Sequence, residues 1–123
     1  EAWDIGVGDE VIVTPLTMSS TTFAVLQANA TPVYADVDKD TFNIDPESIK
    51  NKITAKTKAI ITVSLYGLSP DYDEILDIIK DTDIKLMTNC PLMLGLFKGY
   101  LNRMAMILWK SGCSAMAIYI TLT

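Results

Sequence analysis

The sequence predicts an α/β fold built around a parallel sheet, and three observations support this prediction. Apolar runs at residues 11–13, 33–37, 59–65 and 84–87 have the length of buried strands. Segments with helical spacing of apolar residues separate these runs. The run at 59–65 is rich in β-branched residues, as is typical of a parallel strand covered on both faces. Strands that alternate with helices pair in parallel through right-handed crossovers.

The first helix is expected between the first two strands. The strand at 11–13 follows a glycine-containing turn and closes at a Thr-Pro pair. Hydroxyl side chains at 19–22 are candidate N-caps for a helix that continues through residues 23–28. Asn29 tolerates the left-handed backbone with which many helices end, so we expect the helix to stop there.

Two further helices are expected after the second and third strands. At 45–47, the sequence DPE supplies a capping carboxylate, a proline at the first helical position and an acid in the first turn. The apolar side of this helix comprises Ile44, Ile49 and Ile53. The sequence SPD at 69–71 predicts the start of the next helix, whose inner face carries apolar residues between 75 and 79.

The composition is that of one globular domain without a nucleic-acid-binding surface. The chain has 123 residues, 50% of them hydrophobic, and a net charge of −5 with no basic patch. Cys90 and Cys113 lack metal-binding spacing, and no histidine exists to complete a zinc site or to activate a nucleophile. We expect reduced thiols, with a disulfide as the alternative, and no secretion signal, which together favour a cytoplasmic location.

The composition changes sharply after Asp83. Residues 84–123 contain no acid, and five of the six methionines fall there. Two apolar runs, at 104–109 and 115–122, flank the sequence KSGC. The central lysine and glycine make a single membrane span costly, so we expect two short strands or aberrant sequence and no membrane partner.

An acidic turn follows the second expected strand. Asp36, Asp38, Asp40 and Glu47 have the spacing of a calcium loop. The sixth position of that loop is Thr41 rather than glycine, and a proline directly precedes the glutamate. The turn is therefore interpreted as a solvated strand exit followed by a helix cap, and no metal site is predicted.

A family resemblance rests on residues 30–67, ATPVYADVDKDTFNIDPESIKNKITAKTKAIITVSLYG. This stretch resembles the DegT/DnrJ/EryC1/StrS family of sugar aminotransferases that use pyridoxal phosphate (PLP). A phrase like ATPVFVDVDPDTFNIDPE…TKAIIPVHLYG recurs in that family. The resemblance covers about residues 5–99. It implies that residues 1–99 form a partial three-layer parallel sheet, part of the large domain of a fold-type-I PLP-dependent transferase. Residues 100–123 would be a divergent apolar tail rather than a separate domain.

The resemblance also implies an activity. The family transfers an amino group, usually from glutamate, to a keto group on a nucleotide-linked sugar. Its members work in the cytosol as homodimers with shared active sites. The expected cofactor of this chain is therefore PLP, and the expected partners are a nucleotide sugar and a second subunit.

The family motifs assign candidate site residues. TPLTM at 14–18 matches a phrase like TPLTF, which places Met18 against the cofactor ring. Anchoring on LGLFKG at 94–99 places Thr88 at the position of the aspartate that pairs with the pyridine nitrogen, and Asn89 next to it. Lys110 is the only lysine beyond residue 99 and the weak candidate for the catalytic lysine.

Several of these matches depart from the family pattern. Pro91 replaces a glutamine or glutamate, and Cys113 lies near the expected position of the Schiff-base lysine. The phosphate-binding loop would precede residue 1. We therefore expect a catalytically incomplete member of the family. The alternative is a non-catalytic remnant, truncated or frameshifted near Met87, that at most binds or dimerises.

Overall fold

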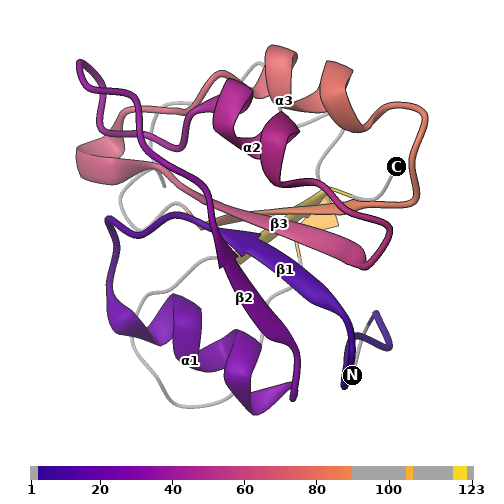
Figure 1. Cartoon of the computed structure of the whole chain (residues 1–123). Helices are drawn as coiled ribbons and strands as arrows, with labels where there is room; N and C mark the ends of the chain where they lie inside the picture. The colour runs from indigo at the N-terminus through magenta and orange to yellow at the C-terminus, as the bar shows by residue number, and fades with distance from the viewer. Residues whose placement is uncertain (1–2, 90–104, 107–117, 122–123) are drawn as a thin grey trace.

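The computed structural model describes residues 3–89, 105–106 and 118–121, which form a six-stranded sheet with helices on both faces (Figure 1). The strand order is β2-β1-β3-β4-β6-β5. The strands are β1 (Glu10–Val13), β2 (Thr31–Tyr34), β3 (Thr57–Val63), β4 (Lys85–Asn89), β5 (Ala105–Met106) and β6 (Ile118–Thr121). The helices are α1 (Ser19–Gln27), α2 (Pro46–Lys52), α3 (Tyr72–Ile79) and the short 3-10 helix η1 (Leu65–Gly67).

The first four strands are parallel, as the sequence predicted. β1 pairs with β2 on one side and with β3 on the other, and β3 pairs with β4. The two short strands β5 and β6 lie within the apolar runs of the tail, and β6 pairs antiparallel with both β4 and β5. No helix among the described residues is long and apolar enough to cross a membrane.

The sheet separates two hydrophobic clusters, because successive strand residues point to opposite faces. Helix α1 covers one face, and α2 and α3 cover the other (Figure 1). On the α2–α3 side, Ile12 and Ile60 are fully buried and are Cα partners in the β1–β3 pairing. On the α1 side, Val11, Val13 and Val25 form the centre of the second cluster. The central strands are thus apolar on both faces, which explains the continuous apolar runs in the sequence.

Two helices begin where their capping signals predicted. The Asp45 carboxylate accepts a hydrogen bond from the Glu47 main-chain N–H at 3.1 Å, and Pro46 is the first residue of α2. The Asp71 carboxylate accepts in the same way from the N–H of Glu74, at 3.1 Å. Each cap satisfies a main-chain donor that the first helical turn leaves without a partner.

Several boundaries differ from the sequence prediction, including the end of β4, which extends to Asn89 rather than residue 87. Helix α1 begins directly after Met18, whose side chain makes no capping hydrogen bond, so the predicted hydroxyl cap is wrong. Strand β2 ends at Tyr34 because the chain turns toward an isolated bridge between Val37 and Ile44. Strand β3 ends at Val63 because the following residues form η1. The expected left-handed residue at Asn29 is confirmed, with φ of 59°.

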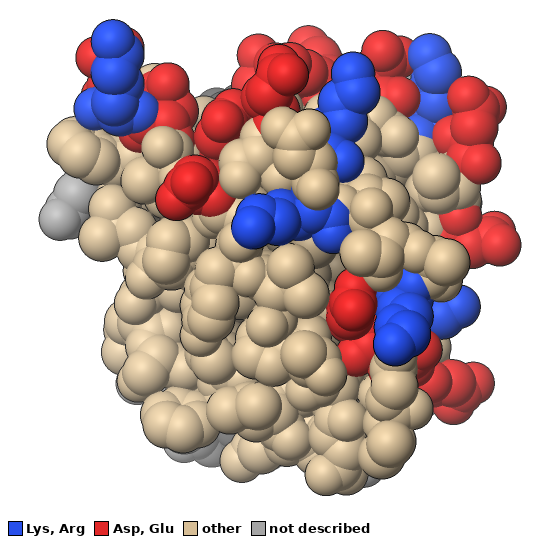
Figure 2. Space-filling view, viewed as in Figure 1, with Lys and Arg blue, Asp and Glu red and all other residues tan. Residues whose placement is uncertain are grey.

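Charge is distributed unevenly over the surface. Residues 11–35 contain no charged side chain, and α1 buries only Thr21 and Val25. Figure 2 shows the charged side chains gathered over the half of the molecule that carries α2 and α3, while the α1 half is largely uncharged. Phe23 and Leu26 are 60% and 48% exposed on α1. This helix therefore presents an uncharged, partly apolar surface.

Candidate functional site

The candidate site lies at the carboxyl ends of the parallel strands. The strand order reverses at β1, which has β2 on one side and β3 on the other. The connections that follow β1 and β3 therefore leave toward opposite faces of the sheet, and α/β proteins bind ligands in the crevice outside such a point. The loop 14–18 after β1 and the loop 64–68 after β3 lie at this edge.

The loop after β1 places Met18 at the surface. The Thr14 side chain is buried, and its hydroxyl accepts a hydrogen bond from the Leu16 N–H at 3.3 Å, which fixes the turn. Met18 is 75% exposed at the N-terminal end of α1. This is not the environment of a core methionine, so the thioether is accessible to a ligand.

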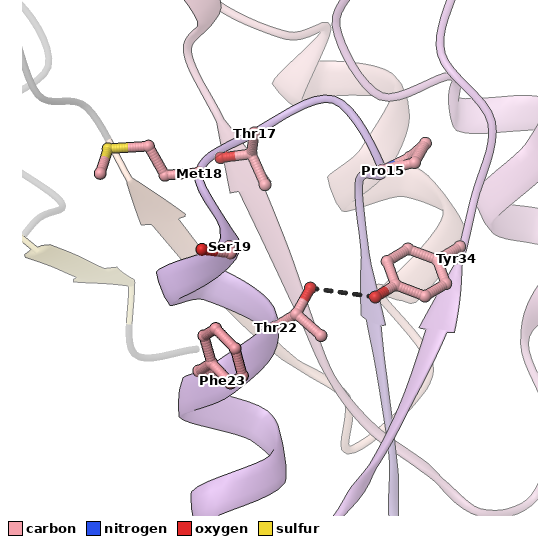
Figure 3. Close-up of a pocket in the computed structure, with 7 residues that line it drawn as sticks. All are labelled: Pro15, Thr17, Met18, Ser19, Thr22, Phe23 and Tyr34. Atoms are coloured by element: carbon pink, nitrogen blue, oxygen red, sulfur yellow. Dashed lines mark hydrogen bonds between the residues drawn. The ribbon is translucent and has the colours of Figure 1, made fainter.

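A hollow of about 390 Å³ lies beside this loop, between α1 and the end of β2 (Figure 3). Pro15, Thr17, Met18, Ser19, Thr22, Phe23 and Tyr34 line it. The hydroxyls of Thr22 and Tyr34 point toward one another and are 3.1 Å apart, whereas Met18 is directed away from this pair (Figure 3). The lining carries hydroxyls, two aromatic rings and a thioether but no charged side chain.

The end of β4 contributes two further uncharged residues. Thr88 is 3% exposed and lies opposite Thr62 of β3. Asn89 lies opposite Val63, on the other face of the sheet from Thr88. The side-chain Oδ1 of Asn89 is buried and has no hydrogen-bond partner among the described residues. A buried acceptor of this kind is costly unless a donor satisfies it, so this oxygen is a candidate ligand contact.

The candidate residues lie at the same carboxyl-terminal end of the sheet, but they do not line the same pocket. Strand β3 lies between β1 and β4, so about 10 Å of sheet separates the end of β1 from the end of β4. Neither Thr88 nor Asn89 lines the hollow that contains Met18. Lys110, together with Pro91 and Cys113, lies outside the described residues.

The acidic turn uses its carboxylates to hold itself together. The Asp38 carboxylate accepts hydrogen bonds from the Thr41 N–H and hydroxyl, both at 2.8 Å, and from the Asp40 N–H at 3.1 Å. These bonds, with the Thr41 N–H the largest effect, lower the pKa of Asp38 below its ordinary value. No three acidic or cysteine side chains converge as metal ligands in the part of the chain that the structure describes.

One further residue near the site was not among the candidates that the sequence assigned. Asn43 is 4% exposed, and its side-chain amide bonds the main chain of the loop after β3. Asn43 lies within the sequence DTFNIDPE, part of the stretch that carries the family resemblance, but no local pattern indicates which distant groups its amide contacts.

The chain was compared with known proteins. A sequence profile of the DegT/DnrJ/EryC1/StrS aminotransferase family matches residues 1–118. The dTDP-3-amino-3,6-dideoxy-alpha-D-galactopyranose transaminase of Aneurinibacillus thermoaerophilus is 46% identical over 89 residues, 72% of this chain and 24% of the relative. The spore coat polysaccharide biosynthesis protein SpsC of Bacillus subtilis is 46% identical over 81 residues, 66% of this chain and 21% of the relative. The chain thus spans about a quarter or less of the length of these relatives.

Solved structures agree with this result. The E. coli GDP-4-keto-6-deoxy-D-mannose-3-dehydratase with bound hydrated PLP has a TM-score of 0.71 and 39% identity, covering 78% of this chain and 25% of that chain. An aminotransferase from Psychrobacter cryohalolentis has a TM-score of 0.69 and 35% identity, covering 72% of this chain and 28% of that one. The predicted fold class, a partial α/β sheet of a PLP-dependent transferase, is confirmed. The chain belongs to the DegT/DnrJ/EryC1/StrS aminotransferase family.

Proposed function

We propose that this chain carries the central sheet of the cofactor domain of a PLP-dependent sugar aminotransferase, and that by itself it does not complete the reaction. The reaction would move an amino group from an amino acid, with glutamate as the expected donor, to a keto group on a nucleotide-linked sugar. One observation carries the proposal: the Met18 loop, the loop after β3 and the end of β4 lie at the carboxyl-terminal ends of three adjacent parallel strands, where α/β proteins bind ligands.

The residues at this end of the sheet supply only part of what PLP-dependent chemistry requires. When bound, PLP supplies an electron sink, provided that a carboxylate keeps its pyridine nitrogen protonated and a lysine holds the cofactor. At the matching position this chain has Thr88, whose hydroxyl is neutral and whose side chain is 3% exposed. A neutral hydroxyl cannot stabilise a pyridinium ion as a carboxylate does. The described residues therefore do not fit the full requirement, and Lys110 is left as the weak candidate for the lysine.

The second candidate function is a non-catalytic binding or dimerising module, and the replacement of the aspartate by Thr88 favours it. A frameshift near Met87 would explain why acids are absent and family motifs weaken after that point, whereas the family profile, which continues to residue 118, speaks against it. Translating the coding DNA in its other frames tests this idea. A phrase with an Asp-containing strand end and a lysine followed by glycines would support it, and its absence from every frame would contradict it.

The remaining expectations follow from the family and form part of the proposal. The substrate class is a nucleotide sugar, the assembly is a homodimer, and the location is the cytoplasm. The largely uncharged lining of the hollow and the net charge of −5 are compatible with a small-molecule ligand and give no support to nucleic acid as a partner.

The test is optical. Purified chain is mixed with PLP, and the near-visible absorbance of lysine-bound PLP is recorded before and after borohydride. We expect no band. The comparison variants are Lys110→Ala and, as a control, Lys52→Ala at an exposed position of α2. A band that disappears in Lys110→Ala but persists in Lys52→Ala would overturn the proposed incompleteness and support full cofactor binding.

A further inference from the structure

The loop 64–68 after β3 occupies the middle of the candidate site. Its strand lies between β1, which leads to the Met18 loop, and β4, which ends at Asn89. The Ser64 N–H donates to the main-chain oxygen of Asn89 at 3.0 Å, which ties the start of the loop to β4. The loop then turns through η1, where Gly67 has φ of 84°. Loop 64–68 therefore separates the Met18 side of the candidate site from the Asn89 side.

Asn43 binds this loop at two points. The loop's Leu65 N–H donates to Asn43 Oδ1 at 3.3 Å, and Asn43 Nδ2 donates to the main-chain oxygen of Leu68 at 3.1 Å. The two loop groups, one donor and one acceptor, lie three residues apart. Of the side chains that fit this buried space, an amide offers an acceptor and a donor together, whereas a carboxylate offers only acceptors.

Asn43 is itself held in place from the opposite side. Its main-chain oxygen accepts from the Asp38 N–H at 2.8 Å, and the neighbouring residue Ile44 bridges to Val37. The Asp38 carboxylate closes the same turn through its three hydrogen bonds. The acidic turn is therefore a rigid support, and the Asn43 side chain extends from it to the loop after β3.

We propose that Asn43 is a positioning residue that fixes the loop 64–68 at the centre of the cofactor edge. The role in a cofactor site rests on the function proposed above. The role of Asn43 in holding the loop does not rest on that function, because it follows from the two hydrogen bonds and from the burial of the side chain. Loss of the amide removes the side-chain partner of the Leu65 N–H and of the Leu68 carbonyl, whose hydrogen bonds to Asn43 are partly shielded from water, and this favours local opening of the loop.

Residue-resolved amide hydrogen exchange tests this proposal without any cofactor, so its failure is distinguishable from the absence of a PLP band. The loop amides are those of Leu65, Gly67 and Leu68, and the reference amides are those of the central strands. We expect Asn43→Leu to raise exchange of the loop amides about tenfold beyond any change at the reference amides.

Two further variants make the test specific. In Asn43→Asp an acceptor remains for the Leu65 N–H but the donor to the Leu68 carbonyl is lost. We therefore expect the Leu65 amide to keep its protection. The Gly67 and Leu68 amides, which donate to the main-chain oxygens of Ser64 and Leu65, should exchange faster only through opening of the η1 turn. Asn51→Leu, the control at an exposed position of α2, should leave the loop unchanged. Equal acceleration of loop and reference amides would show general stabilisation instead of positioning and would overturn the proposal. Unchanged loop exchange in both Asn43 variants would overturn it as well.

Discussion

Replacing Thr88 with aspartate would place a carboxylate, which the proposed match to the family expects at this position, at a point of the sheet that water does not reach. Thr88 is 3% exposed, and Thr62, its partner across the β3–β4 pairing, is 0% exposed. Burial raises the pKa of a carboxyl group by up to about 3–5 pH units, and each unit corresponds to about 1.4 kcal/mol. The Thr62 hydroxyl already donates to the main-chain oxygen of Met87 at 3.4 Å, so a hydrogen bond to the new carboxylate would have to replace that bond. We expect Thr88→Asp to lower the free energy of unfolding by about 3 kcal/mol at pH 7.

The direction of the pH dependence follows from the same argument. The introduced carboxyl has a folded-state pKa above its unfolded value of about 3.9. Below that unfolded value both states are protonated, so the substitution costs little. As the pH rises, the unfolded chain ionises first, and the stability of the folded variant falls. Thr88→Asn is the matched control, because it also removes the threonine hydroxyl but introduces no charge.

Urea unfolding followed by circular dichroism at pH 4 and pH 7 measures these differences. The two variants should have similar midpoints at pH 4 and separate at pH 7. Equal stability of Thr88→Asp and Thr88→Asn at pH 7 would refute the reasoning that this position is dry. Added PLP that raises the midpoint of Thr88→Asp but not of Thr88→Asn would indicate that the carboxylate meets the pyridine nitrogen.

Two further predictions concern the scaffold. Ile60→Ala should lower the free energy of unfolding by about 3 kcal/mol, because Ile60 is fully buried in a central strand. Lys58→Ala, at an exposed position of the same strand, should change the free energy of unfolding by less than about 0.5 kcal/mol. Similar urea midpoints for the two variants would contradict this account of the core. Asp38→Asn should destabilise the acidic turn at neutral pH, because hydrogen bonds from Thr41 hold the pKa of Asp38 below its ordinary value. The contribution of Asp38 is present above the unfolded-state pKa and lost as pH falls through the folded-state value, so the melting temperatures of wild type and variant should converge in acid; a constant difference would argue against it.

The order of strands and helices could be predicted from the sequence because it depends on local signals. Continuous apolar runs reveal strands buried on both faces, as β1 and β3 are. The caps at Asp45 and Asp71 contact main-chain groups two or three residues away, so their spacing is visible in the sequence. The start of α1 was less predictable from the sequence. Several adjacent hydroxyl side chains were candidate caps, but the cap position is Met18, whose backbone is extended and whose side chain makes no capping hydrogen bond.

The site itself was only partly predictable, for a physical reason. Met18, Thr88 and Asn89 are candidates that the family motifs assign, and the strand order places them at the same carboxyl-terminal end of the sheet. Asn43 contacts groups 22 and 25 residues away, and no local pattern encodes such a contact. The same limit applies to the unsatisfied Oδ1 of Asn89, which depends on what the fold places around it.

The uncharged surface of α1 has a consequence for how this protein behaves in solution. Side-chain repulsion between copies comes only from residues outside 11–35, since that segment contributes no charge. With a net charge of −5 at pH 7 and an isoelectric point near 4.5, that repulsion weakens on acidification. Salt acts in the same direction, because it screens charges beyond about 8–10 Å. The colloidal stability of the protein therefore depends on charges outside residues 11–35, and concentrated samples are best kept near neutral pH and low ionic strength.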